Sequence, residues 1–116
     1  MSIVSQQKLV GEATPISETY NTSGDHTVVA AKGAGKYIVA LPLVIQVQGS
    51  TTQTVYVKSG TTVILGPVDL GEREELSVAL PGGLRLGENE ALVVNNSEAE
   101  DIAVTGGYFV ETGDNS

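Results

Sequence analysis

The stretch from Tyr37 to Val68 constrains the fold more than any other part of the chain. It reads YIVALPLVIQVQGSTTQTVYVKSGTTVILGPV, a long apolar run followed by a polar loop and two alternating runs that meet at Ser59-Gly60. Alternating β-branched residues favour strands, and a glycine between two such runs indicates a tight turn. The stretch therefore predicts a long strand and a β-hairpin, around which the remaining strands are arranged.

The composition indicates one all-β domain. The chain has 116 residues and no cysteine, and its 14 glycines and four prolines are spread along the sequence. Aromatic residues are few, so the core must be built from Val, Leu, Ile and Ala. Short strands separated by turn signals every 8–12 residues are typical of sandwiches. We therefore expect a single-domain β-sandwich, jelly-roll-like, with about eight strands.

Three segments are expected along the chain. Residues 1–24 form an extended polar arm, residues 25–111 form the sandwich, and residues 112–116 form a short acidic tail. Within the arm, residues 16–20 alternate as a first strand would. Such an arm is either disordered or held by a partner. Its apolar residues are the candidates for docking: Ile3, Val4, Leu9, Val10, Ile16 and Tyr20.

The apolar strand at residues 37–48 needs a cover on both faces. Pro42 has no N–H to donate to a ladder, so the strand is expected to lie at a sheet edge or to bulge there. One face is wholly apolar and should enter the core: Leu41, Leu43, Ile45 and Val47. An edge strand that is apolar on both faces invites pairing with another chain. A second copy of the chain is therefore the expected cover.

Three glycine-containing segments complete this picture. Gly106-Gly107 lies inside the last strand, which predicts a bulge or the close approach of another backbone. Gly66-Pro67 is expected to end the hairpin, and residues 84–87 are expected to form a tight corner. The predicted subunit contact combines the apolar strand with the paired glycines: Pro42, Val44, Gly106, Gly107 and Tyr108.

The charge and the hydropathy pattern exclude two classes of partner. The net charge is -8 at pH 7, and such a surface repels phosphate backbones, so no nucleic-acid partner is expected. No apolar run approaches the ~20 residues of a membrane helix, so no membrane partner is expected. The first residues also lack the basic and apolar regions of a signal peptide.

No catalytic or cofactor pattern is present. His26 is the single histidine, and the sequence has no G-x-S-x-G nucleophile motif. Five acidic residues supply oxygen ligands suited to calcium, but no calcium-loop motif organises them. These residues are Glu88, Glu90, Glu98, Glu100 and Asp101. We therefore expect no enzyme and no cofactor, and calcium binding by the acidic loops is left open.

The sequence from Thr27 to Glu111 resembles small β-sandwich structural virion proteins of tailed bacteriophages. The resemblance lies in three segments that cover roughly three-quarters of the chain. They are HTVVAA with GAGKYIVALPLV, then QTVYVKSGTTVILGPVDL, and then GGLRLGENEALVVNNSEAEDIAVTGGYFVE. Residues 72–78 depart from it, because they are more charged than in such proteins.

The resemblance implies a capsid decoration, or cement, protein that binds the phage head as a homotrimer. Its partners would be copies of itself and the major capsid protein. It would be made in the host cytoplasm and located on the capsid surface of the virion. An alternative is a tail-fibre or baseplate module that binds a host receptor or glycan through loops at residues 49–52 and 71–75.

Overall fold

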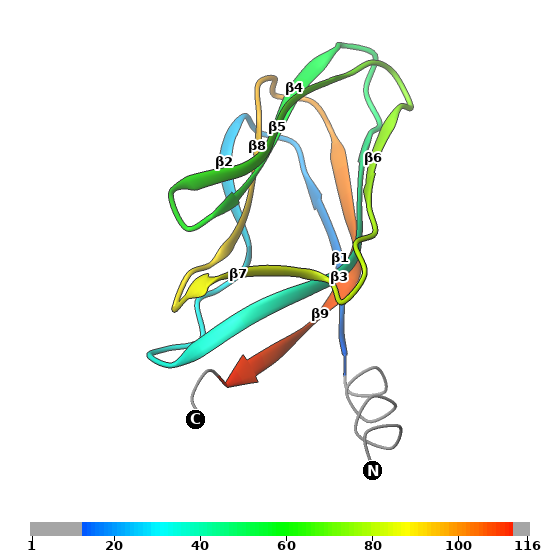
Figure 1. The fold of residues 1–116 in the computed structure, drawn as a ribbon. Helices are drawn as coiled ribbons and strands as arrows, with labels where there is room; N and C mark the ends of the chain where they lie inside the picture. Colours follow the sequence, from blue (N-terminus) through cyan, green and yellow to red (C-terminus); the bar gives the residue numbers. More distant parts are fainter. Residues whose placement is uncertain (1–12, 113–116) are drawn as a thin grey trace.

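The computed structural model describes residues 13–112, which form two antiparallel sheets packed face to face (Figure 1). The predicted all-β sandwich is confirmed. The described strands are β1 (Thr14–Tyr20), β2 (Gly24–Val29), β3 (Lys36–Val47), β4 (Gln53–Ser59), β5 (Thr62–Leu70), β6 (Glu75–Val78), β7 (Leu84–Glu88), β8 (Leu92–Asn96) and β9 (Ile102–Thr112). No helix in this part of the chain is long and apolar enough to cross a membrane.

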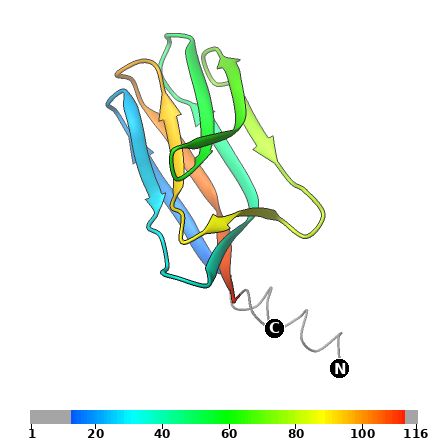
Figure 2. The same cartoon turned by 60° about the vertical axis from the view of Figure 1, so that its left-hand side comes forward.

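The strand order is that of a jelly roll. The five-stranded sheet has the order β1-β9-β3-β6, with β7 also paired to β3, and the four-stranded sheet has the order β2-β8-β4-β5. Leaving β7 aside, the antiparallel pairs are nested: β4 with β5, β3 with β6, β2 with β8 and β1 with β9. The chain is thus one long hairpin rolled into two layers, which face each other in Figure 2.

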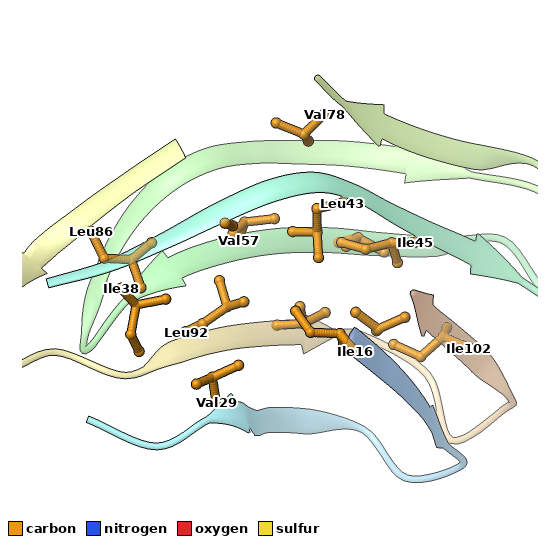
Figure 3. Packing of buried hydrophobic residues seen from close by; sticks show 14 of the residues in the cluster. Ile16, Val29, Ile38, Leu43, Ile45, Val57, Val78, Leu86, Leu92 and Ile102 are labelled. Carbon is orange, nitrogen blue, oxygen red and sulfur yellow. The ribbon is translucent and has the colours of Figure 1, made fainter. Parts of the chain in front are cut away.

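The core lies between the two layers and is almost wholly aliphatic (Figure 3). Leu43 and Ile45 from β3 are fully buried, and they meet Val57 from β4 and Leu92 from β8 within one cluster. Burying each such side chain contributes roughly 1.5–3 kcal/mol. The prediction of a core without many aromatic residues is therefore confirmed for this part of the chain.

The long strand β3 does not lie at an edge of its sheet. It pairs with β9 along one side, and with β7 and then β6 along the other. The predicted bulge is confirmed, because the register with β9 shifts between Ala40 and Leu43. The edge prediction is wrong, because the bulge removes Pro42 from the ladder without ending the pairing. The strand's edges are therefore covered within the chain, and a second copy is not required for that purpose.

The bulge explains the paired glycines of β9. Gly106 has a φ of +147°, and a Cβ atom built there would collide with the carbonyl oxygen of Pro42. The close backbone approach predicted at Gly106-Gly107 is therefore confirmed, and its partner is the β3 bulge of the same chain.

Two other expectations are corrected. β5 continues to Leu70 through Gly66-Pro67, because a register irregularity between Val55 and Val57 of β4 accommodates this segment. Residues 84–88 form strand β7 where a tight corner was expected, because Leu84 and Arg85 pair with Ala40 and Val39 of β3.

We expect Gly106→Ala to lower the free energy of unfolding by about 3 kcal/mol, through strain at positive φ together with collision at the bulge. Gly82→Ala is the matched control, because Gly82 also has a positive φ of 79° and a Cβ there meets nothing within 4 Å. The control should cost only about 1 kcal/mol. Urea denaturation of both variants measures the difference, and equal losses would show that the bulge does not depend on this contact.

Candidate functional site

The outer face of the five-stranded sheet carries a continuous area without charge. Its residues alternate along β1, β3 and β9 with the core residues Ile16, Ile45 and Val104, so they point away from the sandwich interior. We name this area the uncharged face. It consists of Pro15, Ser17, Thr19, Val44, Gln46, Ala103, Thr105 and Gly107. The chain has 20 charged Lys, Arg, Asp and Glu residues in all (6 + 14), so a charge-free area across three strands is a distinctive surface.

Charged residues border the uncharged face at two places. Glu75 of β6 pairs with Gln46 at one margin. Towards β7, the guanidinium of Arg85 lies 3.9 Å from the ring centre of Tyr37, and its Nε donates to Glu111 across 2.7 Å. The uncharged face thus has a polar rim on its β6 and β7 sides.

The structure separates the five residues predicted for a subunit contact. Val44 and Gly107 belong to the uncharged face, and Pro42 is exposed at the adjacent bulge. Gly106 faces Pro42 and serves the fold. Tyr108 packs against the core, and the ammonium of Lys32 lies 5.5 Å from the centre of its ring. Pro42, Val44 and Gly107 therefore remain candidates for a contact, whereas Gly106 and Tyr108 have roles within the chain.

The arm prediction is wrong for its last residues. Ile16 is only 6% exposed and belongs to the core cluster, and β1 pairs along its whole length with β9. Tyr20 stacks on His26 with 4.3 Å between ring centres. Burial, with Glu18 nearby, raises the pKa of Tyr20. Ile16 is thus unavailable for docking on a capsid and Tyr20 has a contact within the chain, while Ile3, Val4, Leu9 and Val10 lie outside the described residues.

His26 hydrogen-bonds to one of two buried side-chain amides, Asn96 and Gln53, that are joined to each other. Its single Nε2 N–H is shared between Asn96 Oδ1 and the Thr22 carbonyl oxygen, each 2.8 Å from Nε2. Asn96 Nδ2 donates to Gln53 Oε1 at 2.9 Å and to the Glu98 carbonyl, and Gln53 Nε2 donates to the Glu100 carbonyl. We name His26, Asn96 and Gln53 the amide network. It contains no nucleophile, and it fastens the loop after β8 to the four-stranded sheet.

The sequence carries a signal for this network in the alternation of its strands and not in a motif. Gln53 lies on the same face of its strand as Val55 and Val57, and Asn96 lies on the same face of its strand as Leu92 and Val94. A polar residue at an inward position must find a partner or lose stability. Two such residues on different strands indicate that they meet.

Two acidic loops, residues 71–75 and 97–101, gather with the uncharged loop 49–52 at the end of the sandwich away from the start of β1. Arg73 N donates to Val47 O at 2.9 Å, and Thr51 N donates to Glu100 Oε1 at 3.0 Å, so loops 49–52, 71–75 and 97–101 lie together. The backbone and side-chain hydrogen bonds from Thr51 lower the pKa of Glu100. Among residues 13–112, no group of three or more His, Cys, Asp or Glu side chains is placed to hold a metal ion.

The residues considered for calcium are dispersed. Glu88 accepts from Gly35 N, Glu90 accepts from the Ser59 hydroxyl, and Glu100 is held by Thr51.

Comparison with protein-family models, with curated proteins and with solved structures finds no match for this chain.

We expect Asn96→Ala to lower the free energy of unfolding by about 2–3 kcal/mol, because it leaves the buried amide of Gln53 under-satisfied. The double variant Gln53→Ala/Asn96→Ala should cost about 1–2 kcal/mol less than the sum of the two single variants. Asn21→Ala, at an exposed asparagine, is the control. Urea unfolding at one fixed protein concentration measures all four, and additive losses would mean that the two amides are not coupled.

Proposed function

We propose that the chain is a structural virion protein of a tailed bacteriophage, a capsid decoration protein that binds the head surface as a homotrimer and stabilises the shell. The observation that carries the proposal is the uncharged face on a protein of net charge -8. The centres of protein interfaces are depleted of charged residues and bordered by a polar rim, which is the pattern around Val44. The resemblance over residues 27–111 supports the same proposal.

The jelly roll is used by viral capsid proteins and by lectins, so the fold agrees with the proposal without deciding it. A decoration protein needs no chemistry of its own. It stabilises a shell by mass action, because a ligand that binds only the assembled lattice shifts the equilibrium by RT ln(1 + [L]/Kd). We therefore infer a role without catalysis, in which the major capsid protein is the partner.

The two ends of the sandwich suit different tasks. β1 begins and β9 ends at one end, and the acidic loops lie at the other (Figure 1). Residues 1–12 precede β1, so their attachment point is the end away from the acidic loops. We propose that these residues bind the shell, which places the acidic loops outward.

The trimer proposal predicts the effect of a charge in the uncharged face. Light scattering of the unaltered protein should give about three times the chain mass of 12.0 kDa. Val44→Lys should give a mass close to one chain, because a buried unpaired ammonium is strongly unfavourable. Val63→Lys is the matched control, since Val63 is 46% exposed on the other sheet, and it should leave the mass unchanged. An unaltered protein of single-chain mass would contradict the trimer.

The shell-binding proposal predicts the effect of a truncation. Deletion of residues 1–12 should abolish co-sedimentation with capsid shells of the virus that encodes the chain, while the melting temperature stays within a few degrees. Deletion of residues 113–116 is the control and should leave binding intact. A longer deletion, to Thr22, is unsuitable because it removes β1 and the core residue Ile16. Undiminished binding of the shorter truncation would place the shell contact elsewhere.

The alternative function, a tail-fibre or baseplate module, gains one observation. The two loops considered for receptor binding, residues 49–52 and 71–75, lie at the same end of the sandwich, since Val47 N donates to Glu74 O and Arg73 N donates to Val47 O. This arrangement would present one continuous loop surface. Binding of the protein to host cells that is lost after changes in these loops, with no binding to shells, would favour this alternative.

A further inference from the structure

The outer face of the four-stranded sheet carries a shallow hollow of about 290 Å³. Its lining residues are Tyr56, Lys58, Val63 and Asn95. Pocket volumes for small ligands begin at roughly 300 Å³, so the hollow has the size of a site for one small ring. It lies on the layer opposite the uncharged face and is separate from the surfaces used in the proposed function.

A row of three residues crosses the strands at this hollow. Asn95 of β8 is paired directly with Asp25 of β2 on one side and with Tyr56 of β4 on the other. Directly paired residues point to the same face of a sheet, and neighbouring strands lie about 4.8 Å apart. The carboxylate, the amide and the aromatic ring therefore stand in line over roughly 10 Å.

The polar groups of the row are held in place by one another. Lys58 Nζ donates to Asp25 Oδ1 at 3.1 Å and to Oδ2 at 3.0 Å, and Asn95 Nδ2 donates to Asp25 Oδ1 at 2.7 Å. The hydrogen bonds from Asn95 and Lys58 lower the pKa of Asp25, so it is ionised at neutral pH. The Lys58 side chain is only 17% exposed, whereas that of Asp25 is 52% exposed. The carboxylate is thus both fixed and open to solvent.

The remaining hydrogen-bonding capacity of these groups matches neighbouring hydroxyls. A carboxylate accepts from several donors, an ammonium has three N–H groups, and an amide offers both a donor and an acceptor. One hydroxyl can donate to Asp25 while its neighbour accepts from Lys58. Charge-assisted bonds of this kind are the stronger ones.

The other wall of the hollow is apolar. Tyr56 is half-buried with Gly66 against its ring, and Val63 is 46% exposed. An aromatic ring beside an exposed valine is suited to the C–H face of a sugar ring, and the polar row is suited to its hydroxyls. An anionic ligand is disfavoured, because Asp25 already neutralises Lys58 and the chain has a net charge of -8.

We propose that this hollow, lined by Tyr56, Lys58, Val63 and Asn95 with Asp25 beside it, binds a neutral saccharide through two adjacent hydroxyls and one C–H face.

The test is an NMR titration of the full chain, labelled with nitrogen-15, using methyl α-mannopyranoside and methyl β-galactopyranoside at millimolar concentrations. We expect saturable shifts of the Asn95 side-chain amide and of backbone amides near Tyr56 and Val63. Fully O-methylated versions of both glycosides should cause no such shifts, because they lack hydroxyl donors. Absence of shifts with both glycosides, or shifts confined to other residues, would overturn the proposal.

Variants assign the binding to the hollow. Tyr56→Ala and Asn95→Ala should each weaken binding about tenfold or more, and Tyr56→Phe should retain it because the ring is kept. Tyr37→Ala is the matched control, since Tyr37 lies on the outer face of the other sheet, and it should bind as the unaltered protein does. A well-dispersed spectrum of each variant shows that it is folded. If Tyr56→Ala binds normally, the proposal is wrong.

Two further measurements separate related outcomes. The methyl glycoside of a sialic acid should bind more weakly than the neutral glycosides, and tighter binding would overturn the neutral class of ligand. Val44→Lys should leave the sugar-induced shifts unchanged whatever it does to the oligomer, because Val44 lies on the other layer. Loss of the shifts in that variant would contradict a site contained within one chain.

Discussion

The fold depends on one nested set of antiparallel pairs that begins at the β4–β5 turn. Gly60 lies in that turn with a φ of +60°. The tight turn needs this left-handed backbone conformation, which glycine adopts without strain. Each further pair outward, β3 with β6, β2 with β8 and β1 with β9, encloses the previous one. Because the two rolled layers must cover each other's apolar faces, the register of each nested pair decides which of its residues enter the core.

The β3 bulge shows how this constraint reaches the surface. Before Pro42 the core residues of β3 are Ile38 and Ala40, and after it they are Leu43 and Ile45, so the bulge changes the inward parity of the strand. Without that change, half of a long apolar strand would face solvent. The same change turns Val44 outward beside Gly107, so the uncharged face is a consequence of how the long strand is accommodated.

The strands could be predicted from the sequence because each one depends on alternation within a few residues. Their neighbours could not, since pairing joins residues far apart, as with Ile16 and Gly106. This is why the sequence alone places Ile16 in an extended arm and leaves an edge position open for β3 beside the bulge. Val44 and Gly107 are candidates for a contact from the sequence alone. Their shared position beside Thr105 and Ser17 is not predictable from it, for the same reason. The inward positions of Gln53 and Asn96 predict that each side chain is buried and needs a hydrogen-bond partner. They do not predict that the two side chains contact each other.

The two outer faces of the sandwich differ in the chemical groups that they present. The uncharged face of the five-stranded sheet presents mostly short side chains without charge, which cost little desolvation when another protein surface covers them. The four-stranded sheet presents Asp25, Lys58 and Asn95 fixed by mutual hydrogen bonds, and covering them with an apolar surface would leave charged groups poorly paired. This difference is the basis for proposing a protein partner at the first face and a small hydroxyl-bearing ligand at the second. Because the hydrophobic core lies between the two faces, each can be altered with little effect on the other.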